Sequence, residues 1–371
     1  MKLFFKNTCK WSHPYVNLYS KDDNIVKKVD AIKECGDKYS IDFDGNLYNH
    51  VSFCGENDDK SSKIFFGSVS LGVEYKKNEA VGRSLTYLTC DDDVTGRVDN
   101  LLISDDLNLS YRNDKAKKIS VFLPKSYDGI TKHDILYFFD AQNLFCKAGH
   151  YTDNGDPYGS WQIDVVLNEI HNQFGKNIIV VGIDNADMYR SNELFMAPNS
   201  FGKLSPLATA IPEDDFSKGY LDNLSAFMIK TLHRFIKENY CVKEDNIGIG
   251  GASMGGIASF YCGLKELGFY KYVLSYSPAY GLYEMDAFDV WFTKYNFRTQ
   301  HNVLPKIHIY CGVGDQLEES LVVASKAMKP LMVKHGYDEN LIFETYDNEK
   351  THNEESWRLI LPESFSLLLN L

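Results

Sequence analysis

One serine in this chain has the surroundings of a catalytic nucleophile. Ser253 lies in the run GASMGG, residues 251–256, after an apolar strand-like segment (residues 246–250) and before a helix-like one (residues 257–267). A serine on a strand-to-helix turn exposes its hydroxyl, and the crowded backbone there requires neighbours with almost no side chain. Glycine stands two positions away on each side. Because the chain has 26 glycines, the pattern alone also fits an ordinary glycine-rich turn.

Two residues further along the chain could activate this serine. A nucleophilic serine needs a base within hydrogen-bond reach and a carboxylate that orients the base. In α/β-hydrolases these groups follow in the order serine, acid, histidine. Asp315 comes just after the strand-like residues 307–311, and His352 lies in the loop after the next strand, residues 341–346. Because the carboxyl ends of parallel strands share one edge of a sheet, we expect both side chains near Ser253.

The identity of the acid is the open part of this triad. Asp315 follows two glycines at a strand end and is the preferred candidate. Glu318 and Glu319 follow closely and stay possible. They lie at the expected start of a helix, where carboxylates also favour the helix dipole without any catalytic role.

Backbone N–H groups should form the oxyanion hole. One is expected from Met254, which follows the nucleophile, and the second from Ala141 or Gln142, in the loop after the strand-like residues 135–139. Trp161, just before a predicted helix, could line the acyl pocket or pack in the core.

Composition restricts the class of protein. The chain has 371 residues, enough for two or three domains, and 44% of them are apolar. The net charge of −12 argues against nucleic acid or an anionic membrane surface as a partner. No stretch approaches the roughly 20 apolar residues of a membrane span, and the N-terminal apolar run is too short for a signal peptide.

The eight cysteines show no metal-binding spacing. We therefore expect no metal and no cofactor. Free, buried thiols suit a reducing compartment, so the cytoplasm is expected unless a leader peptide has been removed.

The pattern of elements changes near residue 95. Residues 1–95 contain short strand-like runs separated by turn signals, typical of a β-sandwich: residues 2–6, 15–19, 39–43, 51–54 and 63–66. The polar run at residues 90–96 is the expected boundary. Residues 96–371 form the second predicted domain.

Strands and helices alternate in this second domain. It starts with a hairpin-like pair, residues 97–104 and 107–112, and a strand at 119–124. Further strands are expected at residues 135–139, 178–183, 246–250, 272–276, 307–311 and 341–346, and helices at 163–174, 221–236, 257–267, 321–333 and at the C-terminus. The chain is therefore predicted to be an α/β protein, an α/β-hydrolase with a mostly parallel central sheet after a small N-terminal β-sandwich.

Several segments carry a resemblance to a known family. They appear in the family's order over about residues 97–371: residues 121–124 (VFLP), 136–145 (LYFFDAQNLF), 180–183 (VVGI), 190–193 (RSNE), the turn at Ser253, 275–278 (SYSP), 312–315 (GVGD) and His352. The chain resembles the putative-esterase superfamily, which contains enterochelin esterases, feruloyl and acetylxylan esterases, S-formylglutathione hydrolases and mycolyltransferases. The resemblance implies the fold and the triad but no particular substrate. Ala141 departs from the glycine common in the family.

The N-terminal segment resembles the starch-binding modules of family 26 through residues 3–7, Trp11 and residues 15–19. In those modules exposed aromatic rings stack on glucose. Trp11 and Tyr15 are therefore candidate glycan contacts, although both could pack in the core. Enterochelin esterases also carry an N-terminal sandwich, so such a domain need not bind glycan.

Together these patterns predict a serine carboxylic-ester hydrolase that acts through an acyl-enzyme on an esterified carbohydrate or another small ester. A siderophore esterase of the enterochelin type, acyl transfer to a sugar, and a glycan-binding protein with an inactive hydrolase scaffold remain alternatives. The natural ester and the oligomeric state are not predicted.

Overall fold

The computed structural model describes residues 2–7, 11–20, 26–35, 38–44, 47–56, 64–65, 71–76, 84–89, 96–104, 116–145, 160–186, 189–209 and 218–369. The structural statements below concern these residues.

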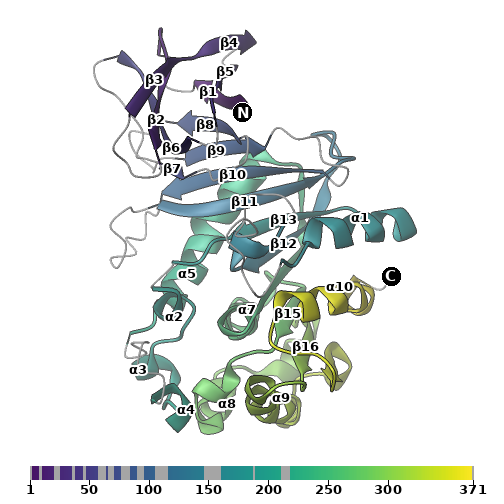
Figure 1. The fold of residues 1–371 in the computed structure, drawn as a ribbon. Coiled ribbons are helices and arrows are strands. Elements are labelled where there is room, and N and C mark those ends of the chain that lie inside the picture. Colours follow the sequence, from purple (N-terminus) through teal and green to yellow (C-terminus); the bar gives the residue numbers. More distant parts are fainter. Residues whose placement is uncertain are drawn as a thin grey trace.

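The fold is built on a large twisted sheet (Figure 1). Six neighbouring strands, in the order β17-β16-β15-β14-β12-β13, are parallel. Next to β13 the sheet continues with antiparallel β11 and β10. The bounds are β10 Gly96–Ser104, β11 Ala116–Pro124, β12 His133–Phe139, β13 Ile178–Ile183, β14 Val242–Ala252, β15 Tyr272–Tyr276, β16 Lys306–Gly312 and β17 Ile342–Asp347.

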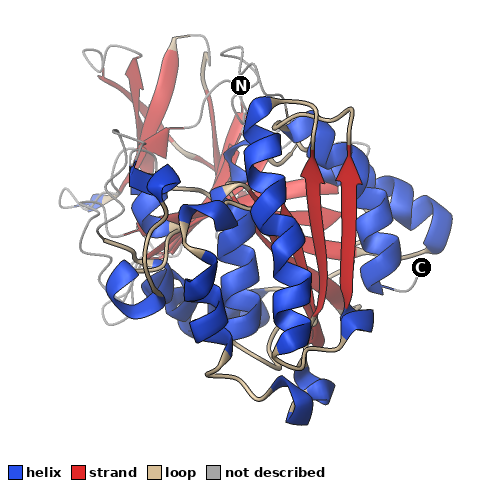
Figure 2. Cartoon of the chain, turned by 90° about the horizontal axis from the view of Figure 1, so that it is seen from below, coloured by secondary structure: helices blue, strands red, loops and turns tan. Residues whose placement is uncertain are grey.

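Helices cover both faces of the parallel part (Figure 2). The central strand β12 is buried throughout, and its residues 135–139 are apolar. Tyr137 and Phe139 belong to one hydrophobic cluster, whereas Leu136 and Phe138 belong to the other. The first cluster includes helices α5 (Leu221–Phe227), α6 (His233–Asn239), α7 (Met254–Lys265), α8 (Met285–Phe292) and α9 (Gln316–Lys334), and the second includes α1 (Ile163–Phe174) and α10 (Glu354–Leu369). This two-sided burial explains why the strand patterns are continuous rather than alternating.

Short helical segments fill the connections. They are η2 Ala141–Asn143, α2 Arg190–Glu193, α3 Pro198–Phe201, α4 Pro206–Thr209, the π-helical η5 Met228–Leu232, η6 Tyr280–Leu282, η7 Phe297–Thr299, η8 His301–Val303 and η9 Glu339–Leu341.

The N-terminal part consists of short, mainly antiparallel strands. One set, in the order β9-β8-β1-β5-β4, extends the large sheet beyond β10, and a second, four-stranded sheet has the order β3-β2-β6-β7. The bounds are β1 Lys2–Asn7, β2 Tyr15–Ser20, β3 Val26–Asp30, β4 Ile32–Cys35, β5 Lys38–Asp42, β6 Tyr48–Cys54, β7 Ile64–Phe65, β8 Leu71–Lys76 and β9 Ser84–Thr89. Because β9 pairs directly with β10, the sheet is continuous across residue 96. The division into domains 1–95 and 96–371 stays a prediction.

The predicted fold class is confirmed: the chain has a mostly parallel central sheet with helices and a small N-terminal unit of strands. Strands β13 and β15 and helix α1 have the predicted bounds, and the other predicted elements that the structure describes differ by a few residues at their ends. The predicted hairpin is different, since β10 pairs with β11, and its expected second arm, residues 107–112, lies outside the described residues. Four strands, β3, β4, β8 and β9, were not predicted.

No helix among the described residues is both long enough and apolar enough to span a bilayer. Among the cysteines whose side chains the structure describes, Cys54, Cys241, Cys262 and Cys311 are free thiols. The expected compartment stays a prediction.

Strand β14 packs so closely against β15 that a side chain at Gly248 would overlap its neighbour. A Cβ atom on Gly248 would lie 2.0 Å from the ring of Tyr272, which is buried in β15. Gly281 is a matched contrast, because its Cβ would meet its nearest atom at an ordinary 3.7 Å.

Gly248→Ala should therefore lower the free energy of unfolding by about 1–3 kcal/mol, the range for overpacking a core, in urea unfolding. Gly281→Ala should change it by less than about 0.5 kcal/mol. Equal effects of the two substitutions would contradict this packing.

Candidate active site

Ser253 lies on a sharp turn between β14 and α7. Its backbone has φ 57° and ψ −118°, a conformation that residues with a side chain rarely adopt. Hydrogen bonds hold this geometry: the Ser253 N–H donates to the Tyr276 carbonyl (2.9 Å), and the Ser253 carbonyl accepts from the N–H groups of Gly256 and Ile257 in α7 and of Ala279. The strained backbone is thus fixed by the first turn of α7 and by the end of β15 with the turn that follows it.

The glycines around Ser253 are required by close backbone approach. A Cβ on Gly251 would lie 2.6 Å from the Gly255 carbonyl oxygen, and a Cβ on Gly256 would lie 2.6 Å from the Tyr276 carbonyl oxygen. Backbone atoms cannot move aside as a flexible side chain can. The run at residues 251–256 is therefore a tight strand-to-helix turn, as its sequence pattern suggests.

The carboxylate against the ring of His352 is Glu318. Oε1 of Glu318 lies 3.1 Å from Nδ1 of His352. Glu318 is fully buried in the first turn of α9, whereas the His352 side chain is 15% exposed. The preference for Asp315 as the ring's partner is not what the geometry shows, and Glu319, the other alternative, is exposed.

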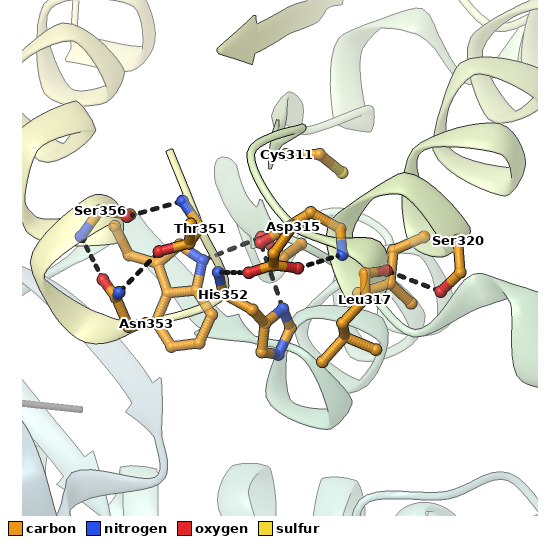
Figure 3. Close-up of polar contacts among 12 residues, drawn as sticks. Cys311, Asp315, Leu317, Ser320, Thr351, His352, Asn353 and Ser356 are labelled. Carbon is orange, nitrogen blue, oxygen red and sulfur yellow. Dashed lines mark hydrogen bonds and ion pairs between the residues drawn. The ribbon is translucent and has the colours of Figure 1, made fainter. Parts of the chain in front are cut away.

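Asp315 contacts the backbone of the same two residues. It caps α9, accepting the Glu318 N–H at Oδ1 (2.8 Å), and accepts the His352 N–H at Oδ2 (2.8 Å), as Figure 3 shows for His352. Burial alone would raise the pKa of Asp315, but these hydrogen bonds outweigh it and hold the pKa below its usual value. Asp315 therefore ties the start of α9 to the loop that carries His352.

No hydrogen bond joins the Ser253 hydroxyl to another group within the described residues. A shared neighbour nevertheless connects the two parts of the site. Tyr276 accepts from the backbone of Ser253, and the next residue, Ser277, donates its hydroxyl proton to Glu318. The serine, the carboxylate and the imidazole thus belong to one connected set of contacts.

The candidate oxyanion donors lie at two helix starts. Met254 is the first residue of α7, so its N–H has no acceptor in a preceding helical turn. Ala141 and Gln142 open η2, directly after β12. A Cβ on Gly255 would lie 2.9 Å from the Asp140 carboxylate, which places the start of η2 beside the start of α7.

An ion pair that the sequence patterns did not single out holds this loop. Asp140 has a left-handed backbone (φ 57°) and receives two hydrogen bonds from Arg190, Nε to Oδ1 (2.6 Å) and Nη2 to Oδ2 (2.9 Å). Asn185 donates a third (3.1 Å). Burial favours a raised pKa for Asp140, but the Arg190 guanidinium outweighs it and lowers the pKa. The RSNE segment at residues 190–193 was the available signal.

Trp161 is a core residue. It is 2% exposed and stacks on Tyr276 (ring centroids 5.7 Å apart) and Trp357 (5.3 Å). Both faces of its ring thus pack against other aromatic rings, and a role of Trp161 in lining an acyl pocket stays a prediction.

The two candidate glycan contacts lie in different surroundings. Trp11 is 7% exposed, and its ring fills the space that a Cβ atom on Gly55 would occupy. Its side chain therefore belongs to the core and not to an exposed surface on which a sugar could stack. Tyr15 is half-buried, and the Lys28 ammonium lies 3.8 Å from its ring centroid. A glycan-binding role for Tyr15 stays a prediction.

Among the described residues no group of three or more His, Cys, Asp or Glu side chains could hold a metal ion. The expectation that no cofactor is needed remains a prediction.

Comparisons with known proteins identify a family and a set of similar folds. A family model described as "Putative esterase" matches residues 110–368. No curated protein sequence matches the chain. Similar solved structures include the BES protein from Bacillus cereus (13% identity, TM-score 0.52, 75% of this chain and 97% of that one) and a ferulic acid esterase (13%, 0.50, 74% and 97%). The siderophore hydrolase EstA from Aspergillus nidulans is another (11%, 0.50, 72% and 91%). At these identities the structural likeness shows the fold alone.

Asp315 joins the backbones of Glu318 and His352, and this contribution to the stability of the fold should depend on pH. The pKa of Asp315 is lower in the folded chain than in the unfolded one. Its carboxylate therefore stabilises the fold fully at a pH above the pKa of the unfolded state, and this stabilisation is lost as the pH falls through the pKa of the folded state. Asp315→Ala should lower the free energy of unfolding by about 1 kcal/mol at pH 7. In urea unfolding, the difference from wild type should shrink below about pH 4. Glu319→Ala is the matched control and should change little, while a difference that stays constant down to pH 3 would refute this role.

Proposed function

This chain belongs to the putative esterase family, and we propose that it hydrolyses carboxylic esters through a covalent acyl-enzyme on Ser253. The observation that carries the proposal is the contact of a buried carboxylate, Glu318, with Nδ1 of His352. Tyr276 and Ser277 connect this carboxylate to the strained strand-to-helix turn at Ser253. A serine, a histidine and an acid in this chain order are the requirements for acyl transfer by a serine hydrolase.

In the proposed reaction the Ser253 oxygen attacks the ester carbonyl while His352 takes the hydroxyl proton. Glu318 fixes the imidazole through Nδ1–H and stabilises the imidazolium. The negative charge on the carbonyl oxygen is held by the N–H of Met254 and by one from Ala141 or Gln142. His352 then gives its proton to the leaving alcohol, and water, activated by the same base, releases the acid and frees Ser253. The proposal requires no cofactor.

The substrate is proposed to be a small ester, most simply an esterified carbohydrate. Two of the structural neighbours are named a ferulic acid esterase and a siderophore hydrolase, and these names define the acyl groups to try first. The net charge of −12 favours neither nucleic acid nor an anionic membrane as a partner. Turnover of a panel of feruloyl, acetyl and siderophore esters, with and without an added sugar acceptor, separates hydrolysis of each ester from acyl transfer.

The nucleophile is tested by Ser253→Ala. Hydrolysis of p-nitrophenyl acetate should fall by about 10,000-fold or more, because no other hydroxyl can form the acyl-enzyme. Thermal unfolding should show a folded protein close to wild type in stability. A variant that keeps full activity would end the assignment.

The acid is tested by comparing Glu318→Gln with Asp315→Asn. The glutamine has nearly the shape of the glutamate but cannot stabilise an imidazolium, so kcat should fall by about 1,000- to 10,000-fold. Asp315→Asn should keep kcat within about tenfold, because Asp315 bonds only to backbone N–H groups, which each contribute modestly. The reverse order of effects would reassign the acid to Asp315.

A further inference from the structure

The turn after β15, residues 276–279, contacts both halves of the proposed catalytic machinery. On one side it holds the nucleophile: the Tyr276 carbonyl accepts from the Ser253 N–H, and the Ala279 N–H donates to the Ser253 carbonyl (3.1 Å). On the other side Ser277 Oγ lies 2.5 Å from Oε1 of Glu318. One short segment therefore sets the position of the acid relative to the nucleophile.

Ser277 has features that a packing residue alone does not need. It is fully buried and has a left-handed backbone (φ 39°), which a residue with a side chain adopts only when its surroundings enforce it. Its N–H donates to the Tyr310 carbonyl in β16 (2.5 Å). The backbone is thus fixed in the conformation that directs the hydroxyl at Glu318.

A third residue sets the direction of the hydrogen bond to Glu318. Nε1 of Trp357, in α10, lies 2.9 Å from Oγ of Ser277. An indole N–H can only donate, and a hydroxyl has a single proton. Ser277 therefore accepts from Trp357 and must give its own proton to Glu318, which favours the ionised carboxylate.

The same oxygen of Glu318 serves both partners. Oε1 faces Ser277 and Nδ1 of His352, whereas Oε2 is buried without a hydrogen-bond partner among the described residues. The edge of the Trp357 ring also meets the His352 ring (centroids 5.0 Å apart, 85° between planes). Trp357 in turn stacks on Trp161, so the aromatic core supports the imidazole and the hydroxyl together.

We propose that Ser277, oriented by Trp357, is a positioning residue that holds the Glu318 carboxylate in line with His352. The proposal rests on the proposed function, because it concerns the efficiency of the same triad. Ser277 acts through Glu318 and does not itself contact the substrate.

Three other titratable groups near Glu318 keep the same charge between about pH 5 and pH 9. Besides His352, these are Tyr310 and Cys311 of β16 and Asp315, which caps the helix. Burial raises the pKa of Cys311 to about 12 and raises that of Tyr310 well above its ordinary value, and the pKa of Asp315 is lowered. A pH effect between about 5 and 9 therefore does not come from these three groups.

The test is Ser277→Ala in the full chain, with p-nitrophenyl acetate as the substrate. Loss of one hydrogen bond to a buried charge should lower kcat by about 10- to 100-fold and leave KM nearly unchanged. Because a hydrogen bond donated to a carboxylate favours its charged form, removing this donor should move the acidic limb of the kcat/KM profile to higher pH by about one unit.

Ser275→Ala is the matched control. Ser275 lies two residues earlier in β15, is equally buried, and bonds to Tyr280 and the Gly256 carbonyl, but not to Glu318. The Ser275→Ala variant should be less stable than wild type, but the acidic limb of its kcat/KM profile should stay at the same pH. Ser277→Gly, which removes the hydroxyl but relieves the left-handed strain, should match Ser277→Ala in kcat.

Double variants separate positioning from general structural damage. In the Glu318→Gln background, Ser277→Ala should cost less than about threefold in kcat, because the hydroxyl acts through the carboxylate. Trp357→Phe keeps an aromatic ring of smaller size and removes the N–H, so it should shift the pH profile in the same direction and add little to Ser277→Ala.

The proposal is overturned if Ser277→Ala leaves kcat and the acidic limb unchanged, or if its effect is as large in Glu318→Gln as in wild type. Either result with Ser253→Ala still inactive would leave the proposed function standing. Activity that survives Ser253→Ala would instead remove the proposed function itself.

Discussion

The backbone of Ser253 is the constraint on which the site depends. Its conformation (φ 57°, ψ −118°) costs on the order of 1–3 kcal/mol for a residue with a side chain. Four backbone hydrogen bonds, to α7, Tyr276 and Ala279, maintain it, and the absence of side chains at Gly251 and Gly256 makes it sterically possible. Strands β14 and β15 must therefore be fully paired before the Ser253 hydroxyl can be exposed on its turn.

The acid is held through the same neighbouring strand. Ser277 follows β15 and bonds to Glu318, while Asp315 fixes the backbones of Glu318 and His352 at one point. Nucleophile, acid and base come from three different connections of the sheet. Their relative positions are consequently set by strand pairing and by the aromatic packing of α10, which are rigid parts of the fold.

Much of this arrangement could be predicted from sequence, for physical reasons. Strands such as β13 are apolar throughout because helices cover both faces, and the glycines around Ser253 report close backbone approach. The sequence could not separate Asp315 from Glu318 as the acid, because the spacing between them also fits an ordinary helix cap and a sequence does not show which carboxylate turns inward. The sequence likewise did not show that the side chains of Trp161 and Trp11 are buried. Strand β3, short and exposed at a sheet edge, has no apolar alternation to reveal it.

The most direct measurement of the account is the rate at which a fluorophosphonate labels the protein, with the modified residue located by mass spectrometry. Labelling requires a serine activated by an oriented histidine. The account predicts a single adduct on Ser253, formed at least about 100-fold more slowly in Glu318→Gln and at a nearly normal rate in Asp315→Asn. An adduct on another residue, or rapid labelling of Glu318→Gln, would contradict it.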